Sequence, residues 1–265
     1  MEEWRSRTFQ WGTGYHWSRR SALAGARDLS YLGIRLLLRI GEMIAVIMAL
    51  FIVIICCYLL TDAQIVVHSA DLPREIEKLA PENNNKELDF KALKTINEDV
   101  IGWIRVDGTG INYPILQGGD NDYYLARNYK KEWATAGSVF LDYRNAADFS
   151  DLFSVLYGHR MGYGKMFSDV TKFSDRNYFD AHTGGELYVG DSKYQLRTVA
   201  FALISAVEQK VYDVEHSKNN ISTVDLIFKE AKYRNNIEGD RYLLLSTCDA
   251  QDRGKRDVLL MLIGL

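Results

Sequence analysis

The stretch Tyr242-Leu-Leu-Leu-Ser-Thr-Cys248 is an apolar run that ends on a cysteine, and a charged loop separates it from a second apolar run, Val258 to Ile263. Short apolar runs bounded by turn residues are typical of buried strands. Six further runs of this kind precede them. The eight predicted strands are Ile101–Val106, Ile111–Leu116, Ser138–Leu141, Phe153–Tyr157, Glu186–Val189, Tyr194–Val207, Arg241–Thr247 and Val258–Ile263. Strands at this spacing predict a mainly β domain, a barrel or a sandwich.

Two stretches of the same domain have helical periodicity instead. Apolar residues recur on one helical face within residues 86–96. A second helix is predicted from Ser222 to Arg234, because Ser222 and Asp225 form a Ser-x-x-Asp start signal and apolar residues follow at helical spacing. We expect this second helix to cover one side of the β structure.

Residues 43–60 carry no charged or amide side chain and can span the hydrocarbon layer as a helix. Arginines precede this run and aspartates follow it, which places the N-terminus in the cytoplasm and the C-terminal part outside the cell membrane. The basic tail is too long for a cleaved signal peptide, so we predict a single-pass signal anchor. The expected organisation is a cytoplasmic tail at 1–42, the anchor at 43–60, a stalk at 61–85 and an extracellular domain at 86–265.

Composition and cysteine usage narrow the possible functions. The 265 residues have a net charge of −3, with lysines and arginines spread among acids, so nothing favours nucleic-acid binding. Cys56 and Cys57 lie in the anchor, as small apolar residues or as a palmitoylation site. Cys248 has no second cysteine outside the membrane and cannot form an internal disulfide. It is therefore a reactive thiol, an intermolecular bridge or a buried structural residue.

Cys248 lies where a strand meets a loop, and Arg256 follows eight positions later. A thiolate nucleophile needs such a cation and an imidazole partner. His159 follows an apolar strand and a glycine, which allows close approach of backbone and substrate. The other histidines beyond the anchor lie in polar or turn segments: His68, His182 and His216. An ordinary loop histidine is the alternative for His159, but its combination with Cys248 and Arg256 favours catalysis.

Together these residues resemble the sortases, specifically class B. The matching pieces are Asn97–Ile104, Ile111–Ile115, Gln117–Leu125, Gly137–Asn145, Tyr157–His159 and Leu245–Cys248. The resemblance implies a closed eight-stranded β-barrel with an N-terminal helix and a helix inserted between late strands, preceded by one transmembrane helix. The tail at residues 1–42 is longer than the family leads us to expect.

The resemblance also implies an activity. Sortases are cysteine transpeptidases that cut a C-terminal sorting signal through a thioester and join the protein to an amine of the cell-wall peptidoglycan. Class B members commonly prefer Asn-Pro-x-Thr-x, which we expect here. Cys248 would be the nucleophile, His159 the acid and base, and Arg256 the donor to the oxyanion. The expected partners are secreted proteins that bear the signal, a wall peptide or peptidoglycan precursor, and membrane lipid; no cofactor, metal or nucleic acid is expected.

The resemblance assigns four residues to the peptide groove: Asn121, Leu125, Tyr157 and Ser246. Asn121 as a turn residue and Leu125 as a core residue are the alternatives. Tyr212 and Asp249 stay unassigned. Three other functions remain open: a sortase that polymerises pilins, a membrane-tethered cysteine peptidase, and a non-catalytic adhesion module.

Overall fold

The computed structural model describes residues 14–81, 88–206, 208–220, 222–248 and 254–264, with the backbone alone for residues 14–29, 66, 67, 209 and 248. Two compact units make up the chain, Met1–Asp62 and Ala63–Leu265.

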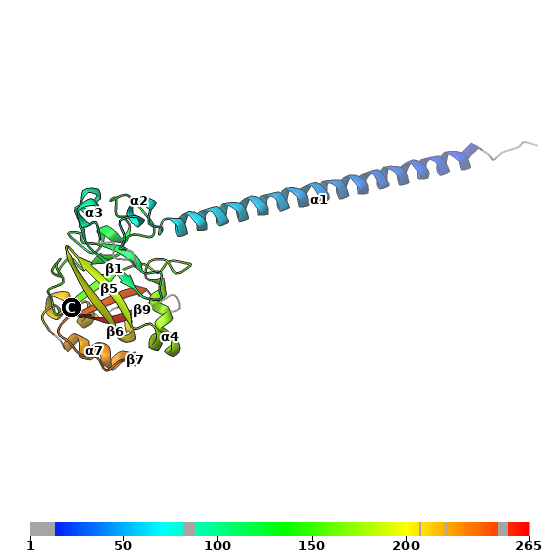
Figure 1. The fold of residues 1–265 in the computed structure, drawn as a ribbon. Coiled ribbons are helices and arrows are strands. Elements are labelled where there is room, and N and C mark those ends of the chain that lie inside the picture. Colours follow the sequence, from blue (N-terminus) through cyan, green and yellow to red (C-terminus); the bar gives the residue numbers. More distant parts are fainter. Residues whose placement is uncertain (1–13, 82–87, 207, 221, 249–253, 265) are drawn as a thin grey trace, which may run out of the picture. The chain divides into compact units, whose positions relative to one another are not determined.

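One long helix, α1 (Gly14–His68), carries the apolar run (Figure 1). Its part Ser30–Ile65 is long and apolar enough to cross a membrane, and none of its most apolar window is buried within the protein. The predicted span at 43–60 lies inside this part. The helix extends well to either side of that span because the flanking residues are mainly good helix formers without a proline.

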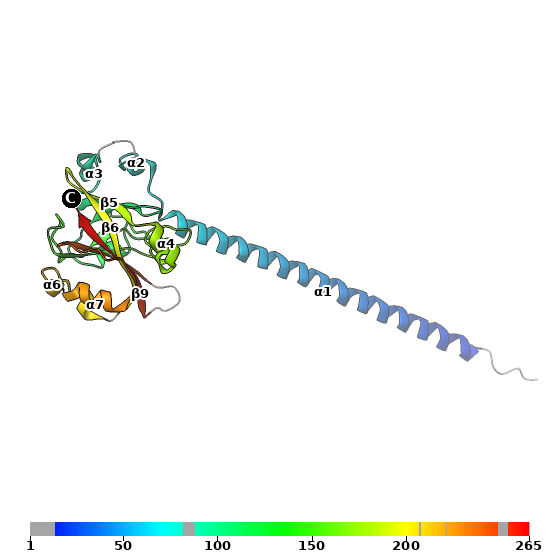
Figure 2. The same cartoon turned by 60° about the horizontal axis from the view of Figure 1, so that its bottom comes forward.

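The second unit is a closed barrel of eight strands, which confirms the predicted fold (Figure 1, Figure 2). The strands are β1 (Val100–Val106), β2 (Asn112–Leu116), β3 (Phe140–Leu141), β4 (Phe153–Tyr157), β5 (Gly184–Val189), β6 (Ser192–Ser205), β8 (Tyr242–Cys248) and β9 (Lys255–Gly264), with β7 (Ala231–Arg234) added outside. Their order is β5-β1-β2-β3-β4-β8-β9-β6, and pairing of β5 with β6 closes the barrel. The pairs β2–β3 and β4–β8 are parallel, and the others are antiparallel. Closure leaves no unpaired edge in the eight-stranded ring.

Short helices connect and cover the strands. They are α2 (Arg74–Glu77), α3 (Phe90–Ile96), α4 (Arg176–Ala181), α5 (Gln209–Tyr212), α6 (Val214–Ser217), α7 (Ser222–Glu230) and the 3-10 turns η1 (Tyr123–Leu125) and η2 (Ser168–Ser174). The helices α2 and α3 lie on one side of the barrel and α7 on the opposite side (Figure 1, Figure 2).

Both predicted helices differ from the observed ones at their ends. Within 86–96, α3 begins at Phe90, because the Asp89 side chain accepts a hydrogen bond from the Ala92 amide at 2.9 Å and caps it. The late helix begins at Ser222, whose amide donates to Asn220 Oδ1 at 2.9 Å. It ends at Glu230 and not at Arg234, because 231–234 pair with β6 as a strand.

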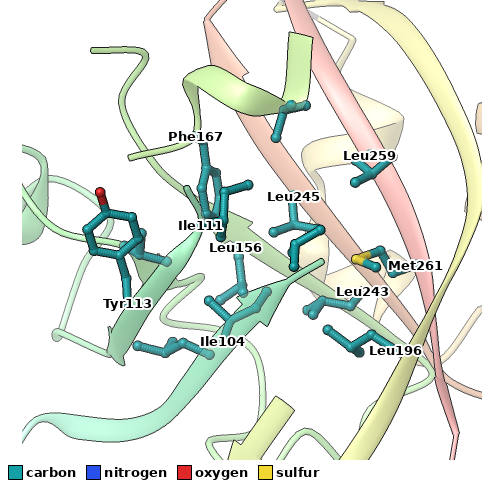
Figure 3. Packing of buried hydrophobic residues seen from close by; sticks show 14 of the residues in the cluster. Ile104, Ile111, Tyr113, Leu156, Phe167, Leu196, Leu243, Leu245, Leu259 and Met261 are labelled. Carbon is teal, nitrogen blue, oxygen red and sulfur yellow. The ribbon is translucent and has the colours of Figure 1, made fainter. Parts of the chain in front are cut away.

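Alternation along each strand divides its side chains between two clusters. Figure 3 shows the barrel interior, where Leu156, Leu245 and Leu259 meet. Leu244 of β8 faces the other way, into a cluster on the outer face that α7 covers. The strands read as continuous apolar runs because both of their faces are buried. On β8, Ser246 therefore follows Leu244 toward the outer face.

The segment predicted as a stalk contains residues that pack against the barrel. Ala70 belongs to the interior cluster, and Ile76 and Ala80 to a third cluster around Trp103. Ile76 is 1% exposed. The compact unit accordingly begins within this segment, at Ala63.

Candidate active site

The antiparallel register of β8 and β9 places Cys248 directly opposite Arg256. Residues opposite each other in an antiparallel pair project from the same face, with Cβ atoms about 5 Å apart. Cys248 is the last residue of β8, and the structure describes its backbone but not its side chain. The strand pairing alone thus brings the predicted nucleophile and the predicted arginine to one face.

His159 reaches the same end of the barrel through the parallel pair β4–β8. Tyr157 of β4 pairs with Ser246 of β8, and the Gly158 amide donates to the Ser246 carbonyl at 3.3 Å. A side chain at position 158 would place its Cβ 2.7 Å from the Phe167 ring, so the chain requires glycine there. Because parallel strands end on the same side of a sheet, His159 and Cys248 follow equivalent positions of neighbouring strands.

A hydrogen bond fixes the orientation of the His159 ring. Nε2 lies 2.7 Å from the Leu125 carbonyl oxygen, which can only accept. Nε2 therefore carries a proton, and Nδ1 is the nitrogen available for proton exchange. A histidine held in this way has the defined tautomer that acid–base chemistry needs.

A cleft of about 520 Å³ collects the predicted site residues. Its lining includes His159 and Arg256 together with all four residues assigned to the peptide groove. Among the described residues, the lining consists of Asn121, Asp122, Leu125, Phe140, Arg144, Tyr157, Gly158, His159, Ala206, Tyr212, Ser246 and Arg256. The strands β3, β4, β8 and β9, the turn η1 and the short helix α5 thus contribute side chains to one cleft.

The polar ends of the predicted groove residues have partners inside the protein. The Asn121 amide nitrogen donates to Asp142 at 2.8 Å, and its oxygen accepts from the Tyr143 amide at 3.1 Å. The Tyr157 hydroxyl donates to Asp142 at 3.1 Å. The Ser246 and Tyr212 hydroxyls lie 3.1 Å apart. These hydrogen bonds hold the side chains in place, and a ligand would contact chiefly the parts of them that do not take part in these bonds.

Leu125 differs from the other three groove residues because it is apolar and 39% exposed. The alternative that Leu125 is a core residue is therefore wrong. Its side chain lines the cleft while its carbonyl holds the His159 ring.

Sequence reasoning missed the charged pair beneath the cleft, Asp142 and Arg144. Asp142 is fully buried, and Arg144 donates to its two carboxylate oxygens from Nε and Nη2, both at 2.8 Å. Nη2 also donates to the Tyr212 carbonyl at 2.9 Å, which attaches α5 to the cleft. Both residues lie in a stretch that resembles the family, but no feature of residue type or spacing indicates which carboxylate is buried.

The environment sets the charge of this pair. Burial tends to raise the pKa of Asp142, but hydrogen bonds from Arg144 and Asn121 outweigh it and hold that pKa below its ordinary value. Burial, followed by the charge of Asp142, raises the pKa of Tyr157, so its hydroxyl stays protonated and donates. At neutral pH the cleft therefore has an ionised carboxylate at its base, and protein donors hold both of its oxygens.

Tyr212, left unassigned from the sequence, lines the cleft beside Arg256. The guanidinium carbon of Arg256 lies 5.6 Å from the centre of the Tyr212 ring, within range of a cation–π interaction. Arg256 thus has a ring beside it on the side of α5. Asp249 lies outside the described residues.

The other candidate histidines lie elsewhere. His182 follows α4 and stacks on Tyr178, with ring centres 4.0 Å apart. His68 ends α1 and contacts Asp71 at 2.8 Å, and His216 belongs to α6. Of the histidines in the described part of the chain, only His159 lines the cleft.

Comparison with known proteins agrees with this geometry. Residues 104–260 match the sortase domain, a range that contains Cys248, His159 and Arg256. Sortase B of Listeria monocytogenes is 36% identical over 169 residues, 62% of this chain and 68% of that protein. A class B sortase of Streptococcus pyogenes involved in pilus biogenesis has 28% identity and a TM-score of 0.61, over 66% of this chain and 98% of that one. The sortase B–substrate complex of Staphylococcus aureus has 28% identity and a TM-score of 0.59, over 66% of this chain and 83% of that one. The chain therefore belongs to the sortase family of cysteine transpeptidases, and within it to class B.

Proposed function

We propose that this class B sortase cuts an Asn-Pro-x-Thr-x sorting signal near the C-terminus of a secreted protein and joins the new end to a peptidoglycan amine. The observation that carries the proposal is the meeting of β4, β8 and β9 at one cleft. There Cys248 is opposite Arg256, and His159 follows the strand parallel to β8.

The proposed roles follow from the chemistry of each side chain. The Cys248 thiol passes its proton to His159 Nδ1, and the resulting thiolate attacks the Thr carbonyl and forms a tetrahedral oxyanion. Arg256, a fixed cation with several donors, stabilises that oxyanion. His159 gives a proton to the leaving amine, the carbon–nitrogen bond breaks, and a thioester remains on Cys248. The acceptor amine then attacks the thioester while His159 removes its proton, and the thiolate leaves.

The cleft supports recognition of an extended peptide. Leu125, Tyr157 and Tyr212 offer apolar and aromatic surface, and Arg256 offers donors for backbone carbonyls. Asn121 and Ser246 complete the proposed subsites from either side of the cleft. Because their polar atoms are held by protein partners, a bound peptide does not have to order them.

The proposed location is the cell membrane, with the catalytic domain outside. The apolar part of α1, Ser30–Ile65, supports an anchor, and the arginines before it support a cytoplasmic N-terminus. This arrangement would hold the cleft near the surface where secreted proteins emerge and wall precursors are delivered.

One similarity favours a second candidate, the polymerisation of pilins. The class B sortase of Streptococcus pyogenes, whose TM-score of 0.61 is close to the 0.59 of the Staphylococcus aureus complex, is involved in pilus biogenesis. In that case the acceptor would be a lysine side chain on a pilin subunit. The chemistry at Cys248 would be unchanged.

Mass spectrometry of the acylated enzyme tests the proposal. The full chain in detergent is mixed with Asn-Pro-x-Thr-x or Leu-Pro-x-Thr-Gly peptides, and the thioester is trapped on Cys248. We expect acylation by the first series, cleaved after Thr, and transfer to an added wall-type peptide amine. Transfer to a lysine-bearing pilin peptide alone would favour the second candidate, and release by water despite added amine would favour a peptidase.

A further inference from the structure

An ion pair joins the loop that follows His159 to the start of β9. Arg160 Nη1 lies 3.3 Å from Asp257 Oδ2, although 97 positions separate the two residues in sequence. Arg160 directly follows His159, and Asp257 directly follows Arg256. The pair therefore links the neighbours of two residues of the proposed catalytic set.

The pair is withdrawn from solvent, in contrast to an ordinary surface pair. The Asp257 side chain is 6% exposed and that of Arg160 is 29% exposed. A carboxylate so far removed from water requires compensating charge and hydrogen bonds in a defined geometry. The contact can thus hold two segments at a fixed separation, which a mobile surface pair cannot do.

The pair acts from behind the cleft. Alternation along β9 places Arg256 on the cleft side with Val258, and Asp257 on the opposite side with Leu259 of the barrel interior. Neither Arg160 nor Asp257 lines the cleft. A peptide in the cleft would therefore contact the catalytic side chains and not this pair.

Backbone contacts also close the loop and attach it to β8. The Phe167 amide donates to the His159 carbonyl at 3.0 Å, and Arg160 forms a β-bridge with Met166. The Gly158 amide donates to the Ser246 carbonyl of β8. The ion pair adds an attachment to β9, the strand that carries Arg256.

We propose that Arg160 and Asp257 are positioning residues that set the separation of His159 and Arg256 on either side of Cys248. The inference rests on the catalytic roles proposed above. It predicts that loss of the pair slows the chemical steps without weakening peptide binding, because the cleft lining stays in place.

The test uses the full chain in detergent with Asp257→Asn, Arg160→Met and the double variant. The matched control is Lys172→Met, which removes the cation from Asp169, a carboxylate whose side chain is also 6% exposed but which is absent from the cleft lining. The measurements are kcat and KM for peptide transfer, the rate of iodoacetamide alkylation at Cys248 by mass spectrometry, and thermal unfolding.

We expect each single variant to lose at least tenfold in kcat with KM within twofold, and to alkylate more slowly at Cys248. The double variant, which removes both charges of this pair, should recover unfolding temperature relative to the single variants but stay slow. Arg160→Lys should restore part of kcat, and Lys172→Met should keep the wild-type kcat.

A double variant with wild-type kcat would overturn the inference, as would a loss of kcat in Lys172→Met equal to that in Arg160→Met. The variant His159→Ala distinguishes failure of the proposed function from failure of the positioning role. If His159→Ala keeps full activity, the catalytic assignment fails. If His159→Ala is inactive while the pair variants are normal, only the positioning role fails.

Discussion

Replacement of Asp142 by asparagine should strongly destabilise the catalytic domain. The side chain is fully buried, and its two oxygens accept from Arg144, Asn121 and Tyr157. An amide at this place turns one acceptor into a donor that faces other donors, and it leaves the Arg144 guanidinium without its counter-charge. Breaking a buried pair costs about 3 to 5 kcal/mol. At roughly 2 to 4 °C per kcal/mol for a domain of this size, the unfolding temperature should fall by about 6 to 20 °C.

The pH dependence of the unfolding temperature provides a second, independent test of the role of Asp142. The net effect on Asp142 is a folded-state pKa below the ordinary value of 3.8. A depressed pKa contributes stability that is present above the unfolded-state pKa and is lost as the pH falls through the folded-state pKa. The difference in unfolding temperature between wild type and Asp142→Asn should therefore be constant from about pH 7 to 5 and shrink below about pH 4.

Circular dichroism melts of residues 63–265 between pH 3 and pH 7 measure both effects. Asp191→Asn is the control, because Asp191 is an exposed carboxylate in the turn between β5 and β6. A loss at pH 7 no larger than that of the control, or a difference that widens toward low pH, would refute the reasoning.

Three further predictions concern catalysis and the boundary of the domain. Cys248→Ala should form no thioester by mass spectrometry, whereas alanine at both anchor cysteines should leave acylation intact; acylation of the Cys248 variant would contradict the assignment. His159→Ala should slow turnover by about a hundredfold or more, the usual effect of losing a positioned acid or base, whereas His182→Ala, which removes a ring outside the cleft, should turn over normally. The opposite ranking would show that the wrong imidazole was chosen. Residues 63–265 should melt several degrees above residues 86–265, because the shorter chain lacks the buried Ile76, worth about 2 kcal/mol; equal melting temperatures would show that 63–85 contribute nothing.

The eight barrel strands were predictable because each is a short apolar run between turn residues. The ninth strand, β7, was not, because Ala231–Arg234 continues the helical pattern of α7 and becomes a strand only by pairing with Phe201 and its neighbours in β6. The short helices α5 and α6 have four residues each, too few for a periodic signal. The local sequence thus predicts the eight strands of the barrel, whereas β7 depends on tertiary pairing with β6.

The site divides in the same way. Cys248, His159 and Arg256 could be predicted because each lies at or next to a strand end, where functional side chains are commonly positioned by a rigid scaffold. Asp142 and Arg144 are not, because their importance arises from burial, and a sequence does not show which of many carboxylates the fold will enclose. Asn121 was assigned to the peptide groove; it lines the cleft, and its side chain also donates a hydrogen bond to Asp142, which the sequence did not indicate.

The polar groups that surround Asp142 and the proposed acid–base residue, His159, differ in how many of their atoms are bonded within the protein. Asn121, Asp142, Arg144 and Tyr157 bind one another, so they stay in place when a peptide enters and require no reorganisation. Within the part of the chain that the structure describes, the His159 ring bonds through Nε2, which leaves Nδ1 for the proposed reaction. Donors and acceptors that are fixed in advance stabilise developing charge more effectively than groups that must move to meet it. On this argument the network around the buried Asp142 contributes to rate by keeping the cleft wall rigid, without contact with the reacting atoms.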